Sequence, residues 1–130
     1  MRERIIMAVF DEIKLKSFKF TMNDLATRLS ISKTSLYENF SSKAELIAAC
    51  VEYLMLDLKN QESEIYNSNK SVLNKFRQLL VIKHKVYPLI NTAVYDELKK
   101  NYPEQWEKVN NFRQSRINNI IELLNDGVRA

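Results

Sequence analysis

The chain has 130 residues, of which 45% are hydrophobic and 28% charged, and its formal net charge is +4. This balance argues against a disordered chain and a coiled-coil rod, and the length suits one compact core or a small helical module joined to a second helical layer. The apolar runs are far shorter than the roughly 20 residues that cross a bilayer, and no secretory cleavage site follows the N-terminus, so we expect a cytoplasmic protein without a membrane segment.

Glycine and proline are scarce, with one glycine and two prolines in the chain. Hairpin turns therefore lack their usual residues, while apolar residues recur at spacings of three and four, which predicts an all-α fold. The single cysteine, Cys50, lies in an apolar helical stripe, so we expect a buried core residue rather than a disulfide partner or a metal ligand. We expect no cofactor and no metal site.

Three short helices are predicted near the N-terminus. A stripe of apolar residues places the first over residues 2–15. Thr21 and Asp24 form a capping-box pattern that starts a second helix directly after Thr21, and Ser32 can cap a third helix over residues 33–39. Two short helices joined by a tight turn and preceded by a packing helix form the unit that lays its last helix in the major groove of DNA.

The remaining chain is also predicted to be helical. Ser42 and Glu45 form a second capping-box pattern, and the apolar stripe that follows predicts a long fourth helix, which ends before a polar stretch at residues 60–70. Further helices are expected over residues 72–86 or 87, over residues 89–100 after the break at Pro88, and from Pro103 to Gly127.

Basic residues cluster among the short helices. Residues 13–43 hold six basic and two acidic side chains, which accounts for the whole net charge. Such a cluster is the footprint of a phosphate-binding surface, although a basic run is more often only a solvated face. The third helix starts with small polar or basic residues that suit the approach to base edges: Ser32, Lys33, Thr34 and Ser35.

A more specific pattern runs from Leu36 to Leu46, where the sequence reads Leu-Tyr-x-x-Phe-x-Ser-Lys-x-Glu-Leu. With the preceding Leu25-Ala26 and Ile31-Ser32-Lys33, it resembles the N-terminal head of the TetR family of regulators. The resemblance implies a three-helix, homeodomain-like head joined by a long fourth helix to a helical regulatory domain. We expect residues 1–47 to bind DNA and residues 48–130 to form the ligand-binding and dimerisation domain, incomplete because family members run on further.

The resemblance also implies roles for individual residues. In the family, the residues matching Thr21, Tyr37 and Lys43 contact phosphates, and those matching Lys33, Thr34 and Ser35 lie nearest the bases. Ser32 and Asn39 complete the DNA-binding set that we expect here. The alternative for Tyr37 is a partly buried aromatic residue whose hydroxyl meets solvent.

Several positions depart from the family pattern. Ser30 replaces the turn glycine, at a cost on the order of 1 kcal/mol if its backbone is left-handed. Thr34 replaces a second glycine and should alter the preferred operator. Glu38 stands where an aromatic residue is common, and we expect it to point away from DNA or to pair with a nearby lysine.

The expected function is that of a sequence-specific regulator of double-stranded DNA, namely a ligand-responsive repressor that binds a palindromic operator as a homodimer. Five aromatic side chains could line an apolar pocket for a small-molecule effector, although such residues are more often simply core: Tyr66, Tyr87, Tyr95, Trp106 and Phe112.

Two other classes of function remain open. A helical interaction adaptor that has lost DNA binding is consistent with Glu38 and with the modest charge. A small helical enzyme would have to use His84, but no serine, cysteine or carboxylate lies at a catalytic or metal-pair spacing from it. The single glycine also excludes a phosphate-binding glycine loop. We therefore expect no catalysis.

Overall fold

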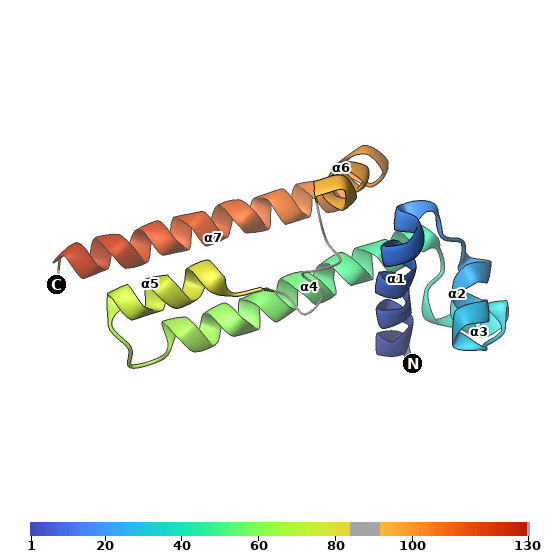
Figure 1. Ribbon diagram of the computed structural model, residues 1–130, viewed down its shortest axis with the longest axis horizontal. Helices are drawn as coiled ribbons and strands as arrows, with labels where there is room; N and C mark the ends of the chain where they lie inside the picture. Colours follow the sequence, from blue (N-terminus) through green and yellow to red (C-terminus); the bar gives the residue numbers. More distant parts are fainter. Residues whose placement is uncertain (84–91, 130) are drawn as a thin grey trace.

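The computed structural model describes residues 1–83 and 92–129, and its regular elements over these residues are all helical (Figure 1), which confirms the predicted fold class. In chain order the elements are α1 (Arg2–Lys16), the 3-10 helix η1 (Ser17–Lys19), α2 (Met22–Leu29), α3 (Lys33–Asn39), α4 (Lys43–Tyr66), α5 (Val72–Val81), α6 (Thr92–Asn101) and α7 (Pro103–Arg129). None of the helices in this part of the chain is long and apolar enough to cross a membrane.

The first three helices and the start of α4 form a head at one end of the molecule (Figure 1). Its centre is apolar and fully buried, with Phe20, Leu25, Leu36, Phe40 and Leu46 each at most 1% exposed. α4 leads away from this head, α5 and α7 pack along it, and α6 packs against α7 and η1, which completes the body. The head and the body therefore share α4.

Local capping explains where the head helices begin. The Thr21 hydroxyl accepts from the Asp24 N–H at 3.1 Å and the Asp24 carboxylate accepts from the Thr21 N–H at 2.8 Å, so the first predicted capping box is confirmed. Ser30 takes the left-handed conformation, with φ 55° and ψ 42°, so the turn keeps its geometry without a glycine.

Of the two hydrogen bonds expected in the second capping box, one is found and the other has a different partner. The Ser42 hydroxyl accepts from the Glu45 N–H at 3.1 Å, as expected. The Glu45 carboxylate instead accepts from the backbone N–H of Ser41 at 2.8 Å and from the Ser41 hydroxyl, one residue before the cap. These two bonds lower the pKa of Glu45.

The body departs from the prediction at the ends of its helices. α4 runs through the polar stretch to Tyr66, because Glu62 and Ile65 are buried there and continue its inner face. α5 ends at Val81, and Ile82 and Lys83 already lie outside a helix, so the predicted extension beyond Val81 is wrong at these two residues. The predicted break at Pro88 lies outside the described residues.

The prediction that the single glycine ends the last helix is wrong. Gly127 lies inside α7, two residues before Arg129. A Cβ atom at Gly127 would lie 2.7 Å from Cγ1 of Val72, in the first turn of α5, which is closer than packed carbon atoms approach. The glycine is therefore explained by the close contact between α5 and α7.

We predict that Gly127→Ala destabilises the fold in the presence of Val72 but not in its absence. Alanine is ordinarily favoured over glycine in a helix by about 1 kcal/mol, and the collision with the stiff Val72 side chain opposes that gain. Chemical denaturation of Gly127→Ala, Val72→Ala and the double variant measures the coupling, expected on the order of 1 kcal/mol. Additive effects of the two substitutions would contradict this explanation.

Candidate nucleic-acid interface

α3 presents one apolar face to the head and the opposite face to solvent. Leu36 and Phe40 are fully buried, whereas Lys33 and Thr34 are exposed and Tyr37 is 47% exposed. Helical spacing places the exposed residues on neighbouring positions of the outward face. The Tyr37 ring is thus half accessible, so its hydroxyl can meet solvent or an external acceptor.

The two ends of α3 are fixed by hydrogen bonds. The Ser32 hydroxyl caps the N-terminus by accepting from the Ser35 N–H at 3.0 Å. At the other end, the Asn39 amide donates to the Ser35 carbonyl at 2.9 Å, and the Asn39 carbonyl accepts from the guanidinium of Arg2 at 2.5 Å. Arg2 also lies 4.1 Å above the Phe40 ring. Ser32, Ser35 and Asn39 therefore hold the helix in shape as well as bordering its outward face.

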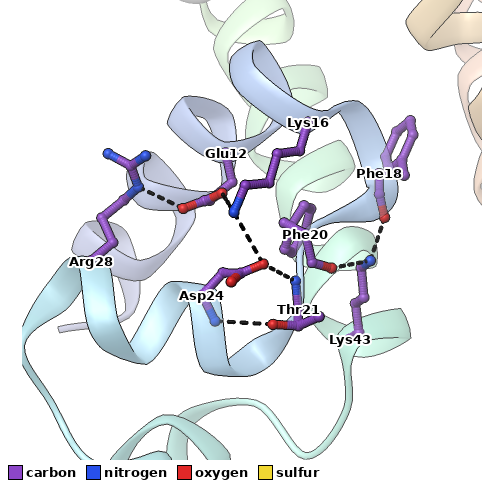
Figure 2. Close-up of polar contacts among 8 residues, drawn as sticks. All are labelled: Glu12, Lys16, Phe18, Phe20, Thr21, Asp24, Arg28 and Lys43. Atoms are coloured by element: carbon purple, nitrogen blue, oxygen red, sulfur yellow. Dashed lines mark hydrogen bonds and ion pairs between the residues drawn. The ribbon is translucent and has the colours of Figure 1, made fainter.

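Thr21 lies at the N-terminus of α2, and Figure 2 shows its reciprocal bonds with Asp24. In this pair the Thr21 hydroxyl is an acceptor, so its own hydrogen remains able to donate to an external oxygen. Thr21 is exposed, which leaves that hydrogen accessible.

Lys43, in the first turn of α4, reaches back to the segment between α1 and α2 (Figure 2). Its ammonium donates to the carbonyl of Phe18 and, at 2.5 Å, to that of Phe20, and it lies 4.2 Å from the centre of the Phe20 ring. Burial lowers the pKa of Lys43, and the nearby Asp24 carboxylate partly opposes that shift. An ammonium has three hydrogens, so one donor remains beyond the two carbonyls.

Much of the basic cluster is paired within the head. Arg28 donates to the buried Glu12 carboxylate at 2.9 Å, and Lys16 lies between Glu12 at 3.6 Å and Asp24 at 3.4 Å (Figure 2). The remaining basic residues of the cluster, Lys14, Lys19 and Lys33, are exposed and form no ion pair with the described residues. The outward positive charge is therefore smaller than the sequence count indicates.

Glu38 is exposed four residues after Thr34, which places both on the same side of α3. Within residues 1–83 and 92–129 it forms no ion pair with a lysine, so the predicted pairing is not found. A carboxylate on this face would repel phosphates but can accept from the amino group of cytosine.

A cavity of about 260 Å³ lies where the head meets the body. Its lining comes from α1, η1, α4, α6, α7 and the residues after α5. Of the aromatic residues predicted for a ligand site, Tyr95 and Phe112 line it, whereas Trp106 packs against Tyr95 with ring centroids 6.2 Å apart and is not part of the lining. Tyr66 ends α4 away from the lining, and Tyr87, like His84, lies outside the described residues.

Cys50 is 3% exposed and lines the cavity, so the prediction of a buried core cysteine is confirmed. Burial raises the pKa of its thiol to about 12. Cys50 is therefore a neutral, weakly polar part of the wall at neutral pH.

A contact that the sequence analysis missed joins the head to the body. Ser17 has φ 54° and ψ −137°, a conformation that side-chain-bearing residues rarely adopt. Its hydroxyl donates to the Glu97 carboxylate of α6 at 2.5 Å, and the Phe18 N–H donates to the same oxygen at 3.5 Å. The Ser17 bond lowers the pKa of Glu97. Eighty positions of sequence separate the partners, and no local pattern marks the pair.

The head has the arrangement that helix-turn-helix proteins use to present a recognition helix. A family model described as bacterial regulatory proteins, tetR family, matches residues 5–50. The HTH-type transcriptional regulator YvaF of Bacillus subtilis (strain 168) is 38% identical over 127 residues, which cover 97% of this chain and 67% of that protein. Fold, head and relative together define a bacterial transcriptional regulator with a DNA-binding helix-turn-helix.

The chain belongs to the TetR family of transcriptional regulators, as the sequence resemblance indicated. A second relative, the nucleoid occlusion factor SlmA of Vibrio cholerae serotype O1, is 26% identical over 81 residues, 61% of this chain and 41% of that protein. The ketosteroid transcriptional regulator KstR2 of Mycobacterium tuberculosis has a TM-score of 0.77 at 18% identity over 98% of this chain and 68% of that one. The TetR family regulator PfmR from Thermus thermophilus has a TM-score of 0.71 at 20% identity over 97% of this chain and 71% of that one. At these identities the two structures show a shared fold alone.

We predict that the Ser17–Glu97 contact stabilises the fold in a pH-dependent way. Because the folded protein lowers the pKa of Glu97 below its usual 4.5, the stabilisation is present above that value and is lost as the pH falls through the folded pKa. Thermal unfolding between about pH 3.5 and 6 should therefore show a shallower pH dependence in Glu97→Gln than in the unchanged chain. Asp96→Asn, an exposed neighbour on α6, is the matched control. Parallel pH profiles for Glu97→Gln and the unchanged chain would rule the contact out.

The same contact distinguishes two substitutions of Ser17. Ser17→Ala keeps the strained backbone and removes the hydroxyl, with an expected loss of about 1 kcal/mol, whereas Ser17→Gly removes the strain as well. Ser17→Gly should therefore be the more stable of the two variants.

Proposed function

We propose that this TetR-family chain is a sequence-specific repressor that lays α3 in the major groove of a palindromic operator as a homodimer, and that a small molecule controls it. The observation that carries the proposal is the outward face of α3, where Lys33, Thr34 and Tyr37 are exposed above a fully buried apolar face. A recognition helix needs this combination, because short polar side chains reach base edges while the buried face fixes their position.

The proposed contacts fall into two groups. Lys33, Thr34 and Ser35 lie at the N-terminal end of α3, the end that contacts base edges in helix-turn-helix proteins, and Ser32 and Asn39 border them. Tyr37, Thr21 and Lys43 would hold phosphates, Tyr37 and Thr21 through their hydroxyl hydrogens and Lys43 through its third ammonium hydrogen. Lys43 also begins α4, where the helix N-terminus favours an anion.

We further propose that residues 1–47 act as the DNA-binding domain and residues 48–130 as the regulatory domain, with α4 connecting the two. We also propose that the protein acts in the cytoplasm and has no enzymatic activity. Within residues 1–83 and 92–129, no group of three or more His, Cys, Asp or Glu side chains could hold a metal ion.

The DNA-binding proposal predicts a salt-dependent affinity that specific residues control. On a duplex selected by the protein from a random pool, Tyr37→Phe should weaken binding at every salt concentration, and Lys43→Ala should reduce the slope of log K against log salt by about 1. Thr34→Gly should instead change the selected sequence. Lys108→Ala on α7, far from the head in sequence, is the charge-matched control.

Lys43 also supports the head, so circular dichroism must show that Lys43→Ala is folded at the assay temperature. Tyr37→Phe removes only the hydroxyl oxygen from a half-exposed ring and tests the interface without that complication. The proposal fails if duplex DNA is not retained even at low salt. It also fails if all three head variants bind as the unchanged chain does.

Dimerisation is supported by an exposed apolar stripe on α7. Ile117 and Ile121 are each 51% exposed and Leu124 is 37% exposed, and their spacing of four and three residues is that of a helix-packing seam. We propose that this stripe pairs with its copy in a second chain. A dimer would present two heads to half-sites about one DNA turn apart, which a single head cannot do.

We predict that light scattering finds a dimer at micromolar concentration and that Ile121→Glu converts it to a monomer, because a carboxylate cannot be buried in an apolar seam without a large cost. Asn111→Glu adds the same charge to an exposed position on another side of α7 and should leave the mass unchanged. A monomer for the unchanged chain, or a dimer for Ile121→Glu, would contradict the proposed seam.

A further inference from the structure

The cavity between head and body has an apolar end and a basic end. Its head-side wall is formed by the rings of Phe10 and Phe18 and by Ile13, and α4 adds Ile47 and Val51. All five are buried hydrophobic residues. A polar group placed against this wall would lose its hydrogen bonds to water without replacement, so this end selects for hydrocarbon.

The opposite end carries positive charge. Arg113 and Arg116 of α7 line the cavity together with Lys83, and no acidic residue is part of its described lining. α7 starts beside α6 near the head and runs away from it (Figure 1), so Arg116 lies seven residues, or about 10 Å, further from the head than Val109 of the same wall. The charge is therefore separated from the apolar wall along the length of one helix.

Contacts within the chain position both arginines but leave some of their N–H donors available. The Nε of Arg116 donates to the Glu62 carboxylate, and the guanidinium of Arg113 lies 5.9 Å from the centre of the Tyr95 ring. A guanidinium has five N–H donors in a fixed fork, so Arg116 keeps donors for a second oxyanion. Planar forks of this kind match the two oxygens of a carboxylate.

We propose that the effector is an ionised carboxylic acid with an unbranched or compact apolar body, its carboxylate at Arg113 and Arg116 and its apolar end against Phe10, Ile13 and Phe18. This inference rests on the proposed function and specifies the chemistry of its effector. The cavity volume of about 260 Å³ is near the lower limit for small-molecule pockets, about 300 Å³, which favours a small acid over a large polycyclic one.

Phe18 connects such a ligand to the DNA-binding head. Its ring lines the cavity, its carbonyl accepts from Lys43, and its N–H donates to Glu97. A ligand that displaces the Phe18 ring also moves the carbonyl that holds the Lys43 ammonium. Occupancy of the cavity thereby acts on a residue proposed to bind phosphate.

The test compares straight-chain carboxylates of increasing length with the alcohols and amines of the same length, binding to the full chain without DNA. Trp106, the single tryptophan, packs against Tyr95 of the cavity wall and reports binding by its fluorescence. We expect the best carboxylate to bind about tenfold more tightly than its alcohol and the amine to bind more weakly still. Equal binding of acid, alcohol and amine, or binding of none, would overturn the proposal.

Two variants test whether the ligand's carboxylate binds at the two arginines. Arg113→Gln removes an exposed cation, and the pair Arg116→Gln with Glu62→Gln removes the second one without leaving Glu62 as a buried, uncompensated charge. Each should lower carboxylate affinity towards that of the alcohol and leave alcohol binding unchanged. Arg77→Gln, an exposed arginine of α5 outside the lining, is the control. An unchanged preference for the acid in both variants contradicts the assigned arginines.

A third variant locates the apolar end. Phe18→Leu lengthens the cavity on the head side and should shift the optimum to a longer acid, and an unshifted optimum contradicts the orientation. Binding is measured without DNA and DNA binding without ligand, so a chain that binds DNA but no acid refutes only the effector class. A chain that binds acids but no DNA refutes the proposed function.

Discussion

The orientation of the head on the body depends on the short segment from Ser17 to Phe20. This segment is irregular, so its polar groups need partners from elsewhere in the chain. Lys43, from the start of α4, donates to the carbonyls of Phe18 and Phe20, and Glu97, from α6, accepts from Ser17 and Phe18. One side chain from each half of the molecule thus fixes the same turn, and the strained backbone of Ser17 persists because both partners determine its position.

In the proposed DNA complex the Lys43 ammonium would serve both the two carbonyls of the turn and a phosphate. The Lys43 ammonium is partly buried, and this burial lowers its pKa. The third hydrogen remains for a phosphate, whose charge-assisted hydrogen bond is stronger than one to a carbonyl, so a phosphate bound there would pull on the ammonium that holds the turn. If Lys43 binds phosphate as proposed, the head's contact with DNA and its attachment to the body are not energetically independent.

Local patterns predicted the parts of the fold whose causes are local. The caps at Thr21 and Ser32 and the outward face of α3 follow from residues at most four positions apart, and all three are found in the structure. The extent of α4 was missed because Glu62 is polar in the sequence yet buried beside Arg116, more than fifty residues away. Gly127 was mistaken for a helix end for the same reason, since its partner Val72 lies on another helix. The same distinction holds for the candidate site. The outward face of α3 could be predicted from local patterns, whereas the long-range contacts of Arg2 and Glu97 could not.

A cavity whose wall includes head residues provides the condition that ligand control requires. A ligand shifts an equilibrium between two arrangements only by the difference between its affinities for them. If the cavity lay wholly within the body, a rotation of the head would leave its shape unchanged and a bound molecule could not distinguish the two states. Here Phe10, Ile13 and Phe18 belong to α1 and η1, so any movement of the head changes the space in which a ligand would fit. The buried side chains of this wall are close-packed, and close-packed side chains repack in discrete steps rather than deform continuously. The shape of the cavity is therefore sensitive to movement of the head.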